Sequence, residues 1–212
     1  MRSKVKVFVR NTSVINAELT YTRSVLPQDS QFLMAGMQHV ANNSDDLVSV
    51  VRGLVEAASA CVGSNMGSLF LLDESRGVLK PFVLHNLPDI YLTGCSEVPL
   101  GAQCCGRAAL HKTPWIVSDM WTDPLFVDCR EAAMAAGLRS AFSVPVLDAK
   151  GNCKGSLASH FRESYIPTPY DLERQSLFAK LIAFALARSD SQPDLAGAVS
   201  GTRRNAEKAV NE

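Results

Sequence analysis

Residues 98–126 read VPLGAQCCGRAALHKTPWIVSDMWTDPLF and residues 137–161 read GLRSAFSVPVLDAKGNCKGSLASHF, and these two stretches decide the fold. In the first, a glycine-flanked turn opens a short helix at the Cys-Gly-Arg-Ala-Ala run, and an apolar strand follows at 115–118. In the second, a Gly-Leu-Arg-Ser turn leads into a strand. The turn at 148–152 then joins this strand to the next one, which predicts an antiparallel hairpin.

The remaining elements follow from hydrophobic periodicity. Apolar residues between positions 47 and 58 recur at helical spacing, which predicts an amphipathic helix with Ser44 as its N-cap. A final helix is expected to begin at Thr168-Pro169, with an apolar surface wider than one face. Pro81 predicts an edge strand or a bulge. Strands are expected at 68–72, 78–84, 97–100, 115–118, 141–147 and 156–161.

The order of these motifs resembles a GAF domain, a small-molecule sensor module of signalling proteins. The most similar subtype is common in bacterial sensor kinases and cyclic-dinucleotide enzymes. Over residues 44–188 the resemblance implies a three-layer α/β/α fold with a mixed, mostly antiparallel sheet of about six strands. We therefore expect an N-terminal arm at 1–28, the domain with its flanking helices at 29–189, and a disordered tail at 190–212.

Composition excludes several classes of protein. The 21 basic and 21 acidic residues give a formal net charge of zero, which provides no electrostatic footprint for nucleic acid. The apolar runs are too short for a membrane span, and the N-terminus lacks the apolar core of a secretion signal. Six cysteines without a CxxC pair do not form a secreted disulfide framework. We expect a soluble protein of the reducing cytoplasm.

The resemblance also implies where a ligand would lie, namely between the sheet and the connections around the third and fourth strands. Trp115 and Phe142 also suit a place in the hydrophobic core. Asp119 and Arg139 could pair with each other as a structural ion pair. Trp121, in a loop, is the preferred ligand contact. The candidate ligand-binding residues are Tyr91, Cys105, Arg107, Asp119, Trp121, Arg139, Phe142, Ser143 and His160.

An enzymatic alternative comes from the cysteines. Cys95, Cys105 and Cys129 resemble in their arrangement the reactive cysteines of free methionine-R-sulfoxide reductases, a branch of the same superfamily. The alternative is therefore a reductase that uses Cys105 with Cys95 or Cys129, because one thiol attacks sulfur and another resolves the intermediate. However, those reductases carry an Asp-x-Asp on the last strand, where this chain has Ala-Ser-His at 158–160. They also carry a glutamate where Ala141 stands.

Other site chemistries have weaker support. The cysteines, with His111 and His160, do not follow a zinc-finger or zinc-ribbon spacing. Phosphate-binding loops, catalytic triads and metalloprotease motifs are not seen. We expect a non-catalytic sensor that binds a small molecule, which could be a nucleotide, and that signals through its terminal helices. A homodimer and a separate output protein are its expected partners, and the sequence identifies no cofactor.

Overall fold

The computed structural model describes residues 46–190 and, before them, Gln38. The predicted arm at 1–28 and residues 191–212 of the predicted tail lie outside the described residues. The described chain runs through α2 (Leu47–Ala60), β1 (Met66–Asp73), β2 (Val78–His85), α3 (Asp89–Gly94), β3 (Val98–Pro99), α4 (Gln103–His111), β4 (Trp115–Val117), the 3-10 helix η1 (Pro124–Cys129), α5 (Arg130–Ala135), β5 (Ser140–Leu147), β6 (Cys153–Phe161) and α6 (Pro169–Asp190).

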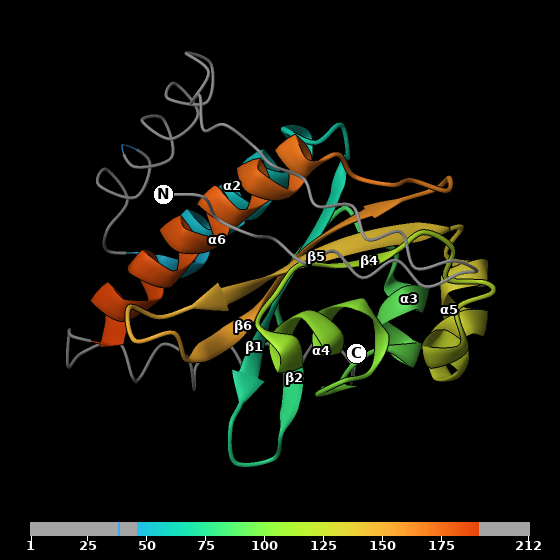
Figure 1. The fold of residues 1–212 in the computed structure, drawn as a ribbon, viewed down its shortest axis with the longest axis horizontal. Coiled ribbons are helices and arrows are strands. Elements are labelled where there is room, and N and C mark those ends of the chain that lie inside the picture. Colours follow the sequence, from blue (N-terminus) through green and yellow to red (C-terminus); the bar gives the residue numbers. More distant parts are fainter. Residues whose placement is uncertain (1–37, 39–45, 191–212) are drawn as a thin grey trace, which may run out of the picture.

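A six-stranded sheet with the order β3-β2-β1-β6-β5-β4 forms the middle layer. Helices α2 and α6 lie on one face, and α3, α4 and α5 lie toward the other (Figure 1). The predicted six-stranded α/β architecture is confirmed, and every pairing between the described strands is antiparallel, where a mixed sheet was expected. The sheet therefore has two faces. Helices α2 and α6 cover one, which we call the helix face. Residues 89–139, which we call the lid, cover the other, the lid face.

Strand β2 contains the irregularity that Pro81 predicts. Leu69 of β1 pairs with Val83, whereas the next residue, Phe70, pairs with Pro81, so Phe82 is the extra residue of a bulge. Proline has no N–H to donate to a neighbouring strand, and a bulge accommodates it in the sheet. The short strand β3 then pairs with the beginning of β2 rather than with its proline.

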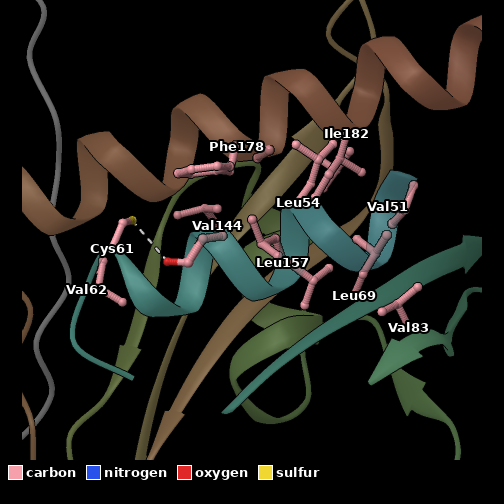
Figure 2. Close-up of a cluster of buried hydrophobic side chains, with 14 of the residues drawn as sticks. Val51, Leu54, Cys61, Val62, Leu69, Val83, Val144, Leu157, Phe178 and Ile182 are labelled. Carbon is pink, nitrogen blue, oxygen red and sulfur yellow. Dashed lines mark hydrogen bonds between the residues drawn. The ribbon is translucent and has the colours of Figure 1, made fainter. Parts of the chain in front are cut away.

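The main hydrophobic core lies between the sheet and the two long helices. Figure 2 shows Phe178 and Ile182 of α6 packed with Leu54 of α2 and with Val144 and Leu157 of the sheet. Each of these side chains is at most 4% exposed. Burying a side chain of this size contributes about 1.5–3 kcal/mol. The apolar residues of the two helices therefore pack mainly against the domain's own sheet. No described helix has the length and hydropathy needed to cross a membrane.

Helix α2 begins later than the sequence predicts. Asp46, not Ser44, is the N-cap, since its carboxylate accepts a 3.1 Å hydrogen bond from the backbone N–H of Ser49. Asp and Ser are nearly equivalent as N-caps. The choice between them depends on where the apolar face must meet the sheet, and Leu47 is the first helical residue packed against that core.

Two glycines of the motif stretches have clear steric roles. A Cβ on Gly106 of α4 would lie 2.1 Å from the carbonyl oxygen of Pro99, so only glycine lets α4 pack this closely on β3. Gly137 follows α5 with a φ of +66°, and its N–H and that of Leu138 donate to carbonyls of α5. This is a Schellman-type helix end, which favours glycine. Both motifs thus fix how the lid joins the sheet.

Candidate functional site

His160 is the central polar side chain of the lid face. It lies on β6, is 2% exposed, and its Nε2 shares a 2.9 Å hydrogen bond with the hydroxyl of Ser68 on β1. Burial lowers the pKa of His160 to about 4, so the imidazole is neutral at pH 7. Its Nδ1 is also buried, and the structure shows no hydrogen-bond partner for it among the described residues.

Tyr91 of α3 covers His160 from the lid side. The two rings lie 5.7 Å apart, centroid to centroid, in an edge-on arrangement. Burial raises the pKa of Tyr91 well above its usual value, which keeps the phenol neutral, and its hydroxyl hydrogen-bonds Cys95 at the end of α3. The predicted residues Tyr91 and His160 are therefore brought together, one from the lid and one from the sheet.

Cys95 and Cys129 form a thiol pair inside the lid, between the end of α3 and the end of η1. Cys129 accepts a hydrogen bond from Cys95, which lowers the pKa of the Cys129 thiol and raises that of Cys95. The side-chain amide of Gln103 donates a further 2.7 Å hydrogen bond to the Cys129 sulfur. All six cysteines are unbridged thiols. Cys129 is thus the better nucleophile of the pair.

Cys105 lies apart from this pair, on α4, in the neighbouring buried cluster. The Ser143 hydroxyl donates a 3.7 Å hydrogen bond to its sulfur and lies 2.6 Å from the Ser156 hydroxyl. Burial raises the pKa of the Cys105 thiol to about 11. The structure therefore brings two of the three predicted reductase cysteines into contact, and the third is a protonated thiol packed on the sheet.

Arg107 lies in the middle of α4, and Asp123 holds it there. Two of its guanidinium nitrogens donate to the two carboxylate oxygens of Asp123, at 3.2 and 2.8 Å. The side chains are 5% and 15% exposed, and the guanidinium also lies over the ring of Trp115. Arg107 was a candidate ligand contact, but its charge is already paired with Asp123.

Asp119, Trp121 and Arg139 form a unit at the edge of the lid. Asp119 accepts a 2.6 Å hydrogen bond from Arg139, which confirms the scaffold ion pair that the sequence offered, and it also caps the backbone N–H of Trp121. The guanidinium of Arg139 lies 4.1 Å from the centroid of the Trp121 ring. The Trp121 indole N–H donates to the carbonyl of Leu138. These three predicted residues contact one another, so their polar groups form hydrogen bonds within the lid.

The prediction that Phe142 contacts the ligand is corrected. Phe142 lies on the helix face, where it is fully buried and stacks on Phe161 and Tyr165. Its neighbour Ser143 lies on the lid face. Successive residues of a strand point to opposite faces, so Phe142 and Ser143 cannot both face a ligand.

Several residues of this region were not identified from the sequence. Ser68 and Ser156 lie in apolar strands, and Met120 sits in a loop yet is fully buried. Gln103 adopts a left-handed backbone with a φ of +49° at the start of α4. Such strain persists only where the surrounding packing enforces it. The one available signal was the period of two along β1, which places Ser68 and Met66 on one face.

The described residues contain no group of three or more His, Cys, Asp or Glu side chains that could hold a metal ion. What they do form is a floor of neutral polar groups, Ser68, His160, Ser143 and Ser156, under an apolar lid. Ala141 and Ala158 stand on the same floor beside His160. Because this floor has no carboxylate, it suits a small molecule without an ammonium group better than one that carries such a group.

Comparisons with known proteins agree with this architecture. The family model described as "GAF domain" matches residues 46–186. The chain is 25% identical over 139 residues, 65% of its length, to the methyl sulfide methyltransferase-associated sensor of Methanosarcina acetivorans, and spans 14% of that relative's length.

Two solved structures share the fold. One is the free methionine-R-sulfoxide reductase of Neisseria meningitidis in complex with its substrate, with a TM-score of 0.63, 19% identity, and coverage of 79% of this chain and 95% of that one. The other is the GAF domain of an Acinetobacter phosphoenolpyruvate-protein phosphotransferase, with a TM-score of 0.64, 14% identity, and coverage of 79% and 98%. With two thirds of its sequence matched by the family model, the chain belongs to the GAF domain family.

Proposed function

We propose that this chain is a non-catalytic sensory domain that binds a small molecule between the sheet and the lid and signals through α2 and α6. The observation that carries the proposal is the placement of β6 between the two layers. His160 of β6 faces the lid, while the next residue toward the N-terminus, Ser159, faces α6. Its hydroxyl donates a 3.0 Å hydrogen bond to Gln175 of α6. The name of the Methanosarcina relative, a sensor, supports the same class of function.

Gln175 gives the two layers a direct polar connection. It is fully buried, and its side-chain amide also donates to the carbonyl of Leu157, again on β6. Burial makes these bonds costly to break without replacement. A ligand that shifts β6 at His160 would therefore favour a different position of α6. A coupling free energy of about 1–3 kcal/mol is typical of such switches.

The proposed partners are a second copy of this chain and a separate output protein, both in the cytoplasm. Phe184 of α6 is 55% exposed, on the side of the helix that the core does not use. Sedimentation equilibrium tests the homodimer: the protein should dimerise, and Phe184→Lys should weaken that dimer. A monomer at high concentration would contradict this part of the proposal.

The sensor proposal is tested by thermal shift against nucleotides and metabolites, followed by hydrogen exchange. A ligand at about 100 times its dissociation constant should add about 2.7 kcal/mol to the free energy of unfolding. The same ligand should alter amide exchange in α6 of the wild type but not of Gln175→Leu. Ser176→Ala is the matched control, because the Ser176 hydroxyl bonds within α6. Unchanged α6 exchange in the liganded wild type would remove signalling through this helix.

The thiol pair favours a second candidate, a free methionine-R-sulfoxide reductase. In that reaction the Cys129 thiolate would attack the sulfoxide sulfur and Cys95 would resolve the adduct, so that two thiols and the sulfoxide become a disulfide, the sulfide and water. Thioredoxin-coupled NADPH consumption with free methionine sulfoxide tests it. Cys129→Ser should abolish turnover and Cys153→Ser should not. No turnover by the wild type eliminates the enzyme.

A further inference from the structure

The imidazole of His160 has one nitrogen that its protein neighbours do not use. Nε2 bonds to Ser68, whereas Nδ1 is buried without a hydrogen-bond partner in the described part of the chain. Leaving a buried polar atom unpaired costs about 1–3 kcal/mol, and buried donors and acceptors nearly always have a partner. Nδ1 is therefore the atom through which a molecule bound under the lid would be held.

Two arginines of the lid are already held in ion pairs. Arg107 is paired bidentately with Asp123, and Arg139 is paired with Asp119. The groups that face His160 directly, Ser68 and the ring of Tyr91, carry no charge. A phosphate or carboxylate brought against His160 would lose its water without gaining a charged partner among the groups that face the imidazole, and an ammonium would find no carboxylate among them. Either transfer is strongly unfavourable.

The surroundings of His160 are otherwise apolar. Met66 pairs with His160 across β1 and β6, and Ala141 pairs with it across β5 and β6. The buried apolar cluster on this face is completed by residues of the lid, namely Tyr91, Cys95, Cys104, Val117, Met120, Phe126, Cys129, Ala133, Ala136 and Leu138. Methionine and cysteine side chains adapt their packing readily. The body of a bound molecule would accordingly be apolar.

The lid is built so that it can make room. Helices α3 and α5 and the 3-10 helix η1 are six residues each, and neither α3 nor α5 has a side-chain cap at its N-terminus. Helices this short are marginal without tertiary contacts. Elements with so little stability of their own are the ones that open locally.

From this geometry we propose that the lid site takes a small uncharged organic molecule, mostly apolar, whose single hydrogen-bonding atom pairs with His160 Nδ1. The inference rests on the proposed sensory function and narrows its ligand class. Nucleotides and other anions are then excluded from the site, as are ammonium compounds. Whether Nδ1 donates or accepts depends on which way the bond to Ser68 runs.

Matched probe pairs of similar shape and different charge test the proposal: benzyl alcohol with benzoate, and 1-butanol with butyrate. The ¹⁵N resonances of the His160 ring are followed by NMR during titration of the whole chain. Ser68→Ala assigns the Nε2 signal, because it removes that partner and leaves the imidazole in place. The alcohols should shift the Nδ1 resonance and lid amides, and the carboxylates should shift neither.

Variants then quantify the contact. Loss of one hydrogen bond should weaken alcohol binding about fivefold in His160→Phe, while His111→Phe, at an exposed position of α4, should bind like the wild type. Should His160→Phe not fold, the wild-type Nδ1 resonance still decides. Alcohol binding that leaves Nδ1 unshifted, or carboxylate binding of equal strength, overturns the inference.

A second titration separates this inference from the function on which it rests. If cyclic GMP or another charged metabolite shifts the lid amides while the alcohols do not, the uncharged ligand class is wrong and the sensory function stands. If the lid amides respond to no probe and to no metabolite, both proposals fail.

Discussion

Acidification should destabilise this domain through His160. The pKa of a histidine is 6.5 in the unfolded reference and falls to about 4 in the folded protein because the ring is buried. The unfolded chain therefore binds more protons between these two values, and the free energy of unfolding falls as the pH is lowered from 6.5 toward 4. From pH 7 to pH 5 this linkage removes about 2 kcal/mol, and below pH 4 about 3 kcal/mol.

The pH 7 to 5 window isolates this group from the acidic residues. Hydrogen bonds and nearby cations lower the pKa values of Asp73, Glu97 and Asp148 below their ordinary 3.8 or 4.5. These carboxylates are ionised throughout the window, so their contribution to stability is lost only at lower pH. The groups facing the imidazole, Ser68 and Tyr91, also keep their charge state.

Urea unfolding at pH 7 and pH 5 measures the effect. His160→Gln has no imidazole to protonate and should lose most of the pH dependence, whereas the exposed control His111→Gln should keep all of it. A wild-type loss below about 0.5 kcal/mol would show that the ring is solvated or paired in the folded state, contrary to its burial in the structure. An equal loss in His160→Gln would show that another group causes the pH dependence.

The other predictions concern single contacts, each read by urea unfolding at pH 7. Asp123→Asn should cost about 3–5 kcal/mol, because it leaves the buried Arg107 unpaired. Gly106→Ala should cost at least about 2 kcal/mol, since its Cβ would overlap the Pro99 carbonyl. Gln175→Leu should cost about 1–3 kcal/mol, because its hydrogen-bond partners on β6 stay buried.

The first two of these changes each have a nearby control. Asp119→Asn breaks an ion pair whose Arg139 side chain is 34% exposed, and should cost less than about 1 kcal/mol. Leu110→Ala alters an exposed side chain of α4, and should stay within about 0.5 kcal/mol. Equal losses in a variant and its control would contradict the role given to burial.

Local patterns were sufficient for most of the fold. The turn at 148–152 does join two antiparallel strands, and Pro81 does lie beside a bulge, because hairpin turns and proline act through their own backbone geometry. The start of α2 was placed two residues early. Ser44 and Asp46 satisfy the same cap chemistry, and the packing of Leu47 on the core, which local sequence does not encode, selects Asp46.

The site was less predictable than the fold. Tyr91 and His160 were both predicted and do meet, whereas the polar groups of Arg107 and Trp121, also candidate ligand contacts, bond to Asp123 and to Leu138. These two hydrogen bonds join residues that are 16 and 17 positions apart in the sequence. Residue type shows that a buried arginine needs a partner, yet only the three-dimensional arrangement shows which residue supplies it.

The alternation of faces along β6 is the physical basis of the proposed sensory mechanism. Because successive residues point to opposite sides, His160 and Ser159 place the lid site and the α6 contact on adjacent residues. A shift of β6 that brings His160 Nδ1 to a ligand must also move the Ser159 hydroxyl, which donates a hydrogen bond to Gln175. In the proposed mechanism, the close packing of the interior passes that displacement on to α6. A double-mutant cycle of His160→Gln and Gln175→Leu measures this coupling: the two costs should fail to add by at least about 0.5 kcal/mol, and strict additivity would separate the two layers.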